Sequence, residues 1–214
     1  MSIPTSQETR LSWSEVSARR LERHALSAPA RDARPADVVA VMCGAHAQVL
    51  SAAELSIGLR IAGLTRTDVH QALWSERSLV KTFGPRGTVH LLPAGDLPMW
   101  TGALSALPSA GGHTKNARMT PEQTDEVVAA IAVALRDAEL TADELSEVVI
   151  AATGPWAGDL VMPAFQGMWP RWRQALSTAA NRGALCFGPN RGRKTTSGRY
   201  SPTTKVDAPE ALRL

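Results

Sequence analysis

A short turn motif occurs once in each half of the chain, and it restricts the fold more than any other feature. Residues 83–87 read Phe-Gly-Pro-Arg-Gly, and residues 187–192 read Phe-Gly-Pro-Asn-Arg-Gly, with Asn190 as the one insertion. Proline holds its φ near one value and glycine tolerates positive φ, so both segments predict a tight turn. Strand-forming residues lie on both sides of the first copy, at 79–83 and 88–92. We therefore predict two hairpins, each with an arginine at its tip.

An amphipathic helix is predicted directly before each hairpin. Thr65 and Asp68 have the spacing of a capping box, and apolar residues follow at helical spacing; a similar apolar pattern runs from Trp172 to Ala180. A helix followed by a hairpin with a basic tip is the plan of a winged helix, and its repetition over about half the chain favours duplication. The alternative is two unrelated hairpins, because Gly-Pro is common in turns.

The predicted fold class is mainly α with short β-hairpins (α+β), arranged as tandem winged-helix domains. Residues 1–110 form the first predicted domain and residues 111–194 the second, with a linker at 108–119. Residues 195–214 show no sustained periodicity and are expected to form a weakly ordered tail.

Helix starts are predicted at capping boxes outside the hairpin units as well. Ser12 and Glu15 open a first helix, in which Val16, Leu21 and Leu26 are expected to be buried. In the second half, two further boxes predict helix starts, at Thr120 with Gln123 and at Thr141 with Glu144.

Positive charge is collected near the C-terminal end of the sequence. The net charge is only +3, yet residues 160–206 contain eight Lys or Arg and no Asp or Glu, so the rest of the chain is net negative. Such segregation favours a polyanionic partner, and double-stranded DNA is the partner expected here; the alternative is a solvated basic face.

Several other classes of protein are not indicated. No apolar run is long enough for a membrane helix and no signal peptide is recognisable, so we expect a cytoplasmic protein without a membrane partner, and a monomer is favoured. Cys43 and Cys186 have no metal-ligand spacing and are expected to be reduced and buried. No Gly-rich phosphate loop or zinc-type histidine spacing is present, so no metal and no cofactor are predicted.

Two polar side chains interrupt an apolar stretch. His46 and Gln48 lie among Ala, Val, Leu and Gly residues, and in an extended segment their spacing of two places both on one face. Buried polar groups need hydrogen-bond partners or a cleft to face. Either the pair caps adjacent helix ends, or it faces a cleft.

Phosphate contacts are expected first at the hairpin tips, where Arg86 and Arg191 can donate hydrogen bonds together with the turn backbone. Further candidate phosphate contacts are Lys81, His90, Arg171, Arg173, Arg193 and Lys194. A cluster of Trp156, Trp169 and Trp172 with Phe165 predicts a core or domain interface, with base stacking as the alternative.

The chain resembles the winged-helix DNA-binding family that includes bacterial DNA glycosylases acting on alkylated and interstrand-crosslinked bases. The resemblance rests on Ala-His-Ala-Gln at 45–48, where many members read Gln-x-Gln, on the segment 55–60, on Leu-Val-Lys-Thr at 79–82, and on Arg-Gly-Thr-Val-His-Leu at 86–91. It covers residues 11–194; residues 195–214 do not resemble the corresponding segment of the longer members.

This resemblance implies a monofunctional glycosylase that hydrolyses the N-glycosidic bond of N7-alkylated purines in duplex DNA. It implies catalytic roles for His46 and Gln48 and adds Thr82 and Thr88 to the DNA-binding residues. An N7-alkylated guanine is already cationic and leaves without a general acid, so the enzyme has to hold a water at C1′. The alternative function is a non-catalytic winged-helix DNA-binding protein or transcriptional regulator.

Overall fold

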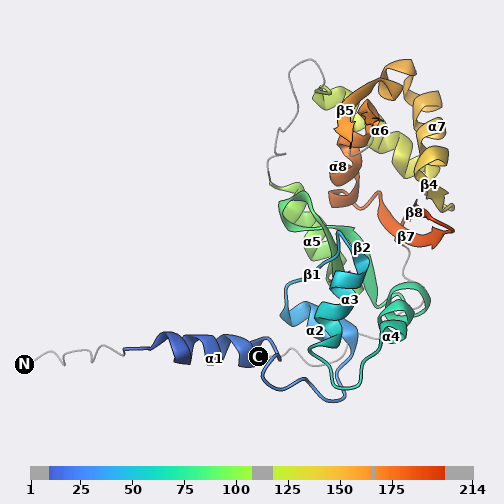
Figure 1. The fold of residues 1–214 in the computed structure, drawn as a ribbon. Helices are drawn as coiled ribbons and strands as arrows, with labels where there is room; N and C mark the ends of the chain where they lie inside the picture. Colours follow the sequence, from blue (N-terminus) through green and yellow to red (C-terminus); the bar gives the residue numbers. More distant parts are fainter. Residues whose placement is uncertain (1–9, 108–117, 165–166, 201–214) are drawn as a thin grey trace, which may run out of the picture.

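The computed structural model describes residues 10–107, 118–164 and 167–200 (Figure 1). The described residues contain eight α-helices and eight short strands. The helices are α1 (Trp13–Arg23), α2 (Pro35–Val41), α3 (Leu50–Gly58), α4 (Arg66–His70), α5 (Leu97–Ser105), α6 (Pro121–Ala134), α7 (Ala142–Thr153) and α8 (Leu176–Asn181). The strands are β1 (Ala45–His46), β2 (Leu79–Phe83), β3 (Val89–Pro93), β4 (Leu140–Thr141), β5 (Leu160–Ala164), β6 (Gly167–Pro170), β7 (Cys186–Arg191) and β8 (Lys194–Gly198).

Six of the strands form one antiparallel sheet in the order β1-β3-β2-β7-β8-β4. Its centre consists of two hairpins, β2–β3 and β7–β8, at the places predicted from the sequence. The first motif forms the turn as expected, but the prediction of a turn at residues 187–192 is wrong: strand β7 includes residues 187–191, with an irregularity between Phe187 and Asn190, and the chain turns at residues 192–193, so Arg191 ends a strand instead of lying at the tip. The hairpins meet edge to edge through the pair Lys81 and Phe187. In Figure 1 the β7–β8 hairpin reaches from the upper half of the molecule toward β2 in the lower half. The two halves of the chain therefore share a sheet.

The order of elements is the same on both sides of that junction. The first half runs α2-β1-α3-α4-β2-β3, and the second runs α6-β4-α7-α8-β7-β8, with the small β5–β6 hairpin inserted between α7 and α8. In both halves the short leading strand pairs with the second strand of the hairpin. The mixture of helices and antiparallel hairpins confirms the coarse fold class, whereas the division into two winged-helix domains stays a prediction.

Each half packs its own hydrophobic core. One cluster of buried residues lies between residues 38 and 91, and the other lies between residues 119 and 185. The rings of Phe83 and Phe187, which occupy the same place in the two turn motifs, meet at the junction with their centroids 5.4 Å apart. Phe83 packs against both cores, so it links the two halves.

The capping boxes expected from the sequence are present. Ser12 with Glu15, Thr65 with Asp68, Thr120 with Gln123, and Thr141 with Glu144 each form the reciprocal pair of hydrogen bonds at a helix start. These local signals are confirmed because both partners lie within one turn of the helix.

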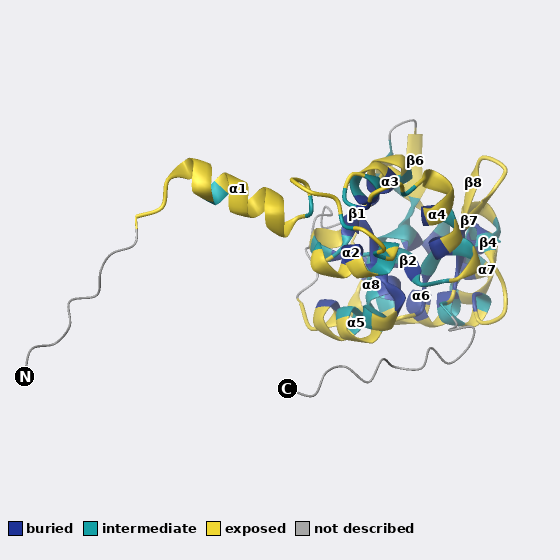
Figure 2. Ribbon diagram, turned by 90° about the horizontal axis from the view of Figure 1, so that it is seen from below, coloured by how far each residue is buried: buried dark blue, intermediate teal, exposed yellow. Residues whose placement is uncertain are grey.

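The first helix corrects one expectation. α1 buries none of its residues: Leu21 is exposed and Val16 is only partly covered, and Leu26, which lies beyond the end of the helix, is exposed as well. Figure 2 shows α1 lying outside the body of the molecule with most of its surface exposed. An apolar stripe indicates which face a helix can bury, but burial also requires a partner element.

Three more expectations need correction or lie outside the described part. Residues 195–198 belong to β8 rather than to a tail, and residues 201–214 lie outside the described residues. Cys43 is exposed in the turn after α2, whereas Cys186 is largely covered and burial raises its pKa to about 11. Phe165 and most of the predicted linker also lie outside the described residues. No helix of the described part is both long and apolar enough to cross a bilayer.

Candidate active site and DNA-binding surface

His46 and Gln48 lie at the outer edge of the six-stranded sheet. Burial alternates along this edge: Ala45 and Ala47 are fully buried in the first core, whereas His46 and Gln48 are exposed. Because successive side chains of an extended segment point to opposite faces, both polar residues face away from the core. The structure thus brings the predicted pair to one solvent-facing side, as its spacing indicated.

The segment that carries His46 and Gln48 lies between α2 and α3, and the backbone at its start ends α2. Cys43 and Gly44, at the end of α2, have φ of 56° and 102°. A Cβ on Gly44 would lie 2.9 Å from Leu92 Cδ2, so this position needs glycine on both conformational and steric grounds. At the other end, Val49 is the N-cap of α3 and provides no side-chain cap. The backbone of residues 45–47 therefore pairs with β3 instead of joining either helix.

The imidazole of His46 contacts a second histidine across the sheet. His46 pairs in register with His90 of β3, and the two rings meet edge to face, with centroids 5.4 Å apart and planes at 87°. His90 is 7% exposed, and its Nδ1 lies 2.9 Å from the carbonyl oxygen of Thr88. A carbonyl only accepts, so Nδ1 carries the proton in this contact and Nε2 is left as the acceptor of the neutral ring.

A glycine makes room for the His90 ring. A Cβ on Gly84 would lie 2.8 Å from His90 Nδ1 and 2.9 Å from Cγ. Gly84 belongs to the repeated turn motif, where the sequence indicated only its role in the turn. The structure adds that the missing side chain leaves room for the buried imidazole beside Gly84.

The amide of Gln48 is anchored to the neighbouring strand β3. Its Oε1 accepts a hydrogen bond of 3.4 Å from the backbone N–H of Val89, and the N–H of Ala47 donates to the Val89 carbonyl at 2.7 Å. A backbone N–H can only donate, so this contact orients the amide with its oxygen toward the strand. The Nε2 group is then turned away from β3 as a donor.

A cavity with a volume of about 550 Å³ begins at this edge of the sheet and extends under the second half of the chain. Gln48 lines it, whereas His46 does not. The sheet contributes Lys81, Phe83 and Phe187, and the opposite wall contains Trp169 and Arg173 together with residues of α7 and α8. The sequence did not indicate this cavity, because its walls come from segments about a hundred residues apart.

The predicted basic residues fall into three groups. Arg86 and Arg193 are exposed, and neither forms an ion pair with another described residue. Lys81 and Arg173 line the cavity and are half-buried. The remaining three predicted cations, Arg171, Arg191 and Lys194, are engaged by carboxylates of the protein itself.

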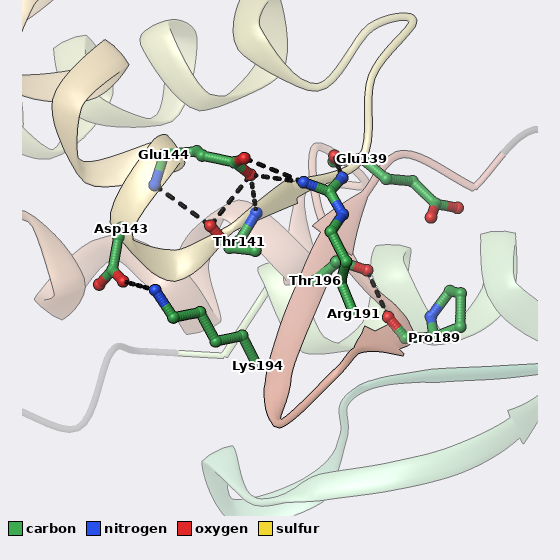
Figure 3. A network of polar contacts seen from close by, with 8 residues as sticks. All are labelled: Glu139, Thr141, Asp143, Glu144, Pro189, Arg191, Lys194 and Thr196. Carbon is green, nitrogen blue, oxygen red and sulfur yellow. Dashed lines mark hydrogen bonds and ion pairs between the residues drawn. The ribbon is translucent and has the colours of Figure 1, made fainter.

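The second hairpin shows this engagement most clearly (Figure 3). Arg191 donates to Glu144 Oε1 at 2.9 Å and to the carbonyl of Glu139 at 2.7 Å, and Lys194 Nζ lies 2.6 Å from Asp143 Oδ2. Figure 3 shows both side chains directed from the hairpin toward the start of α7. Hydrogen bonds from the Thr141 backbone N–H and hydroxyl, and the charge of Arg191, hold the pKa of Glu144 below its ordinary value.

Several other predicted contacts are less accessible than expected. Thr82 is 2% exposed and shares its register with buried His90, while Thr88 is partly covered and its hydroxyl donates to the Pro85 carbonyl at 3.2 Å. Arg171 binds Asp159 at 3.1 Å beneath the β5–β6 hairpin.

The tryptophan cluster divides between core and cavity. Trp172 is 1% exposed and donates to the Ser146 hydroxyl, and Trp156 packs against the second core, as the core interpretation expected. Trp169 instead is 41% exposed, and the Arg173 guanidinium lies 4.3 Å from its ring centroid. The cluster therefore supplies both a core residue and a ring that borders the cavity.

One buried carboxylate was not indicated by the sequence analysis. Glu54 of α3 is 7% exposed and binds Arg66 and His70 at 2.9 and 2.7 Å. The sequence does contain a signal for this buried ion pair, because Glu54 is the one charged residue in the apolar stretch 50–58.

Among the described residues, no group of three or more His, Cys, Asp or Glu side chains is arranged to hold a metal ion. His46, Gln48 and His90 form the candidate site. Together they present one exposed imidazole and one exposed amide on the same strand edge.

The chain is similar to proteins of known function and to a solved structure. The chain is 36% identical over 194 residues to an interstrand DNA cross-link repair glycosylase of Streptomyces sahachiroi, a match that covers 86% of this chain and 48% of that protein. The solved structure of the S. sahachiroi DNA glycosylase AlkZ superposes with a TM-score of 0.72 at 32% identity, over 89% of this chain and 50% of that one. The chain thus spans about half the length of these relatives.

A family model described as "DNA glycosylase AlkZ-like" matches residues 39–214. The match includes residues 195–214, so the expectation that this segment has no counterpart in the family is wrong. It also contains the histidine–glutamine pair, both hairpins and the whole cavity lining. The chain belongs to the AlkZ-like DNA glycosylase family.

Proposed function

We propose that this protein binds duplex DNA and hydrolyses the N-glycosidic bond of N7-alkylated purines, with His46 and Gln48 as the catalytic residues. Family membership supports glycosylase chemistry, and the S. sahachiroi relative is a cross-link repair glycosylase. The observation that carries the proposal is the placement of the two side chains. Both are exposed on one face of the sheet edge, and contacts with residues of β3 position them.

The chemistry that these residues have to perform is limited. An N7-alkylated guanine carries positive charge and departs as a neutral base, so the protein needs to supply no proton to the leaving group. What remains is to hold a water against C1′ of a sugar with oxocarbenium character. The Nε2 of Gln48 donates to that water, and a neutral His46 imidazole accepts its proton as the new bond forms.

His90 acts in this proposal as a positioning residue and not as a phosphate contact. It is buried, its Nδ1 is held by the Thr88 carbonyl, and its ring meets that of His46. These contacts restrict how the His46 ring can turn, and correct orientation of a base contributes to rate. The Thr-Val-His run at 88–90 thus anchors both catalytic side chains.

DNA binding is proposed to use the tandem winged-helix arrangement. The exposed tip of the first hairpin carries Arg86 with φ of 62°, beside Gly87 with φ of 68°. A guanidinium on a tight turn donates to a phosphate together with backbone N–H groups. Arg86 and Arg193 are the tip cations without an ion pair among the described residues, so they are the first candidates for phosphate contacts.

The test is release of 7-methylguanine from a methylated duplex by the 214-residue protein, measured beside a binding titration. Gln48→Ala and His46→Ala should each slow release by about a hundredfold or more, the usual range for loss of a proton-transfer group, while duplex affinity stays nearly unchanged. Matched controls are Gln71→Ala and His24→Ala, which remove the same side chains from exposed positions elsewhere.

The rival function is DNA binding without catalysis, and the specific observation in its favour is that the chain spans about half the length of its relatives. Salt-dependent duplex binding with no base release by the unmodified protein would select this alternative. If the two control variants instead release 7-methylguanine as slowly as Gln48→Ala and His46→Ala do, His46 and Gln48 do not have the catalytic roles assigned to them.

A further inference from the structure

α1 presents a face that the rest of the described chain leaves largely uncovered. The helix buries none of its residues, and Figure 2 shows it outside the body of the molecule. Trp13 is 81% exposed, and Val16, Arg20 and Arg23 follow it at spacings of three, seven and ten positions. Residues at these spacings lie along one side of a helix. This side, the α1 face, is apolar at its N-terminal end and basic at its C-terminal end.

A face with the opposite charge lies on α6, in the second half of the chain. Glu122 is followed by Glu126, Ala129 and Val133 at spacings of four, seven and eleven positions, and all four residues are exposed. Val133 is 64% exposed. This side, the α6 face, is therefore acidic at its N-terminal end and apolar at its C-terminal end.

The charges of both faces are available to a partner. Arg20 and Arg23 on α1 form no ion pair with any described residue, and the same is true of Glu122 and Glu126 on α6. A single exposed ion pair contributes little stability. Complementary charges beside an apolar contact do, however, fix the register and orientation of two surfaces and exclude other arrangements.

The two faces match when their helices run antiparallel. With Trp13 opposite Val133, Arg20 comes opposite Glu126, because each charged residue lies seven positions from the apolar residue of its own helix. The second arginine and the second glutamate follow at ten and eleven positions, so they also lie close together. A parallel arrangement would place the tryptophan at the acidic end of α6 and the arginines at its apolar end. The pattern therefore selects the antiparallel pairing.

We propose that the α1 face of one molecule packs antiparallel on the α6 face of a second copy of this chain, and that the second copy makes the same contact in return. Within one molecule the two helices lie apart: α1 extends from the first half of the chain, whereas α6 belongs to the second (Figure 1). A helix of 11 residues is about 16 Å long, so one contact is small, and two reciprocal contacts bring the buried area closer to the roughly 1,600 Å² of a standard interface. A reciprocal contact closes after two molecules. The proposal thus replaces the monomer favoured from the sequence with a dimer.

Sedimentation velocity of the 214-residue protein over a concentration series tests this inference. The measurement needs no DNA, so its outcome is separate from that of the proposed function. We expect a monomer–dimer equilibrium in the micromolar range that weakens as ionic strength rises, because salt screens exposed charges. A protein that stays monomeric at every concentration in low salt would overturn the inference.

Substitutions in the two faces locate the contact. Trp13→Ser, Arg20→Glu and Glu126→Arg should each lower the association constant by at least about tenfold, because every change affects both reciprocal contacts. The three side chains are exposed and lie outside both hydrophobic cores, so the free energy of unfolding should stay nearly unchanged. As a matched control, Arg31→Glu reverses an exposed arginine outside both faces and should associate as the unmodified protein does.

A charge swap tests the register. Arg20→Glu and Glu126→Arg should each self-associate weakly, whereas an equimolar mixture of the two variants should form a heterodimer about as readily as the unmodified protein forms its dimer. In that heterodimer one contact pairs the two reversed charges, and the other keeps Arg20 opposite Glu126. If the mixture associates as weakly as its components, or if Arg31→Glu weakens association equally, the proposed contact is wrong.

Discussion

The two hairpin units are built alike, yet they differ at the position where the first unit carries its catalytic candidates. In the first unit β1 sets His46 opposite His90; in the second, β4 sets Thr141 opposite Thr196. The motif glycine lies against the facing residue in both: a Cβ on Gly84 would meet His90, and one on Gly188 would meet Thr196. The same scaffold thus holds two imidazoles in one unit and two hydroxyls in the other.

The segments after these strands explain why the two units diverge. Thr141 is itself the N-cap of α7 and forms a capping box with Glu144, so helix begins at the next residue. After His46 three residues, 47–49, precede the start of α3 at Leu50, and the N-cap Val49 forms no side-chain hydrogen bond. That delay turns Gln48 to the exposed face beside His46. The three residues between β1 and α3, which have no counterpart between β4 and α7, therefore include the amide of Gln48.

The largest expected effect distinguishes the two motif glycines. Gly84→Ala should displace the buried His90 ring and Gly188→Ala the Thr196 side chain, so each should reduce the free energy of unfolding by about 1–3 kcal/mol. Only Gly84→Ala should also lower the rate of 7-methylguanine release by stably folded protein. Denaturant unfolding and the release assay measure the two quantities, and equal activity losses in both variants would contradict the assignment of chemistry to the first unit.

Replacing the facing residues tests the positioning role directly. His90→Phe keeps a ring in place but removes the bond to the Thr88 carbonyl, so base release should fall by about tenfold, with a changed dependence on pH. Thr196→Val, which removes the hydroxyl that donates to Pro189, should leave the rate and its pH profile unchanged. An unaltered pH profile in His90→Phe would indicate a structural role only.

The capping box of the second unit provides a smaller effect with a defined pH dependence. Thr141→Ala should cost about 1 kcal/mol of stability near pH 7, the usual value of a lost cap. Hydrogen bonds to Thr141 depress the pKa of Glu144 in the folded protein, so its contribution is present above its unfolded pKa and is lost as the pH falls through the folded value. The difference between Thr141→Ala and the unmodified protein should therefore shrink on acidification below the ordinary pKa of a glutamate; a constant difference would show that the carboxylate takes no part.

The smallest effect compares the two arginines predicted for the hairpin tips, Arg86 in the first turn and Arg191 at the end of β7. Arg86→Gln should weaken duplex binding severalfold and reduce the slope of log affinity against log salt by about 0.9, the value for one phosphate contact in B-DNA. Arg191→Gln should leave that slope unchanged, because this guanidinium is held by Glu144 and the Glu139 carbonyl. Equal slope changes would mean that the Arg191–Glu144 ion pair opens on DNA and that both arginines contact phosphate.

The sequence alone predicted the features whose signals lie within a few residues of each other. The capping boxes, the two hairpins and the shared face of His46 and Gln48 follow from spacings of two or three positions, where steric and hydrogen-bonding rules act locally. The edge-to-edge junction at Lys81 and Phe187, the pairing of Arg191 with a carboxylate 47 residues away and the cavity beneath Trp169 were decided only by the tertiary structure. So was the exposure of α1, whose apolar stripe has a clear period but meets no packing surface among the described residues. Local patterns specify which groups can be presented, whereas long-range packing determines which of them meet.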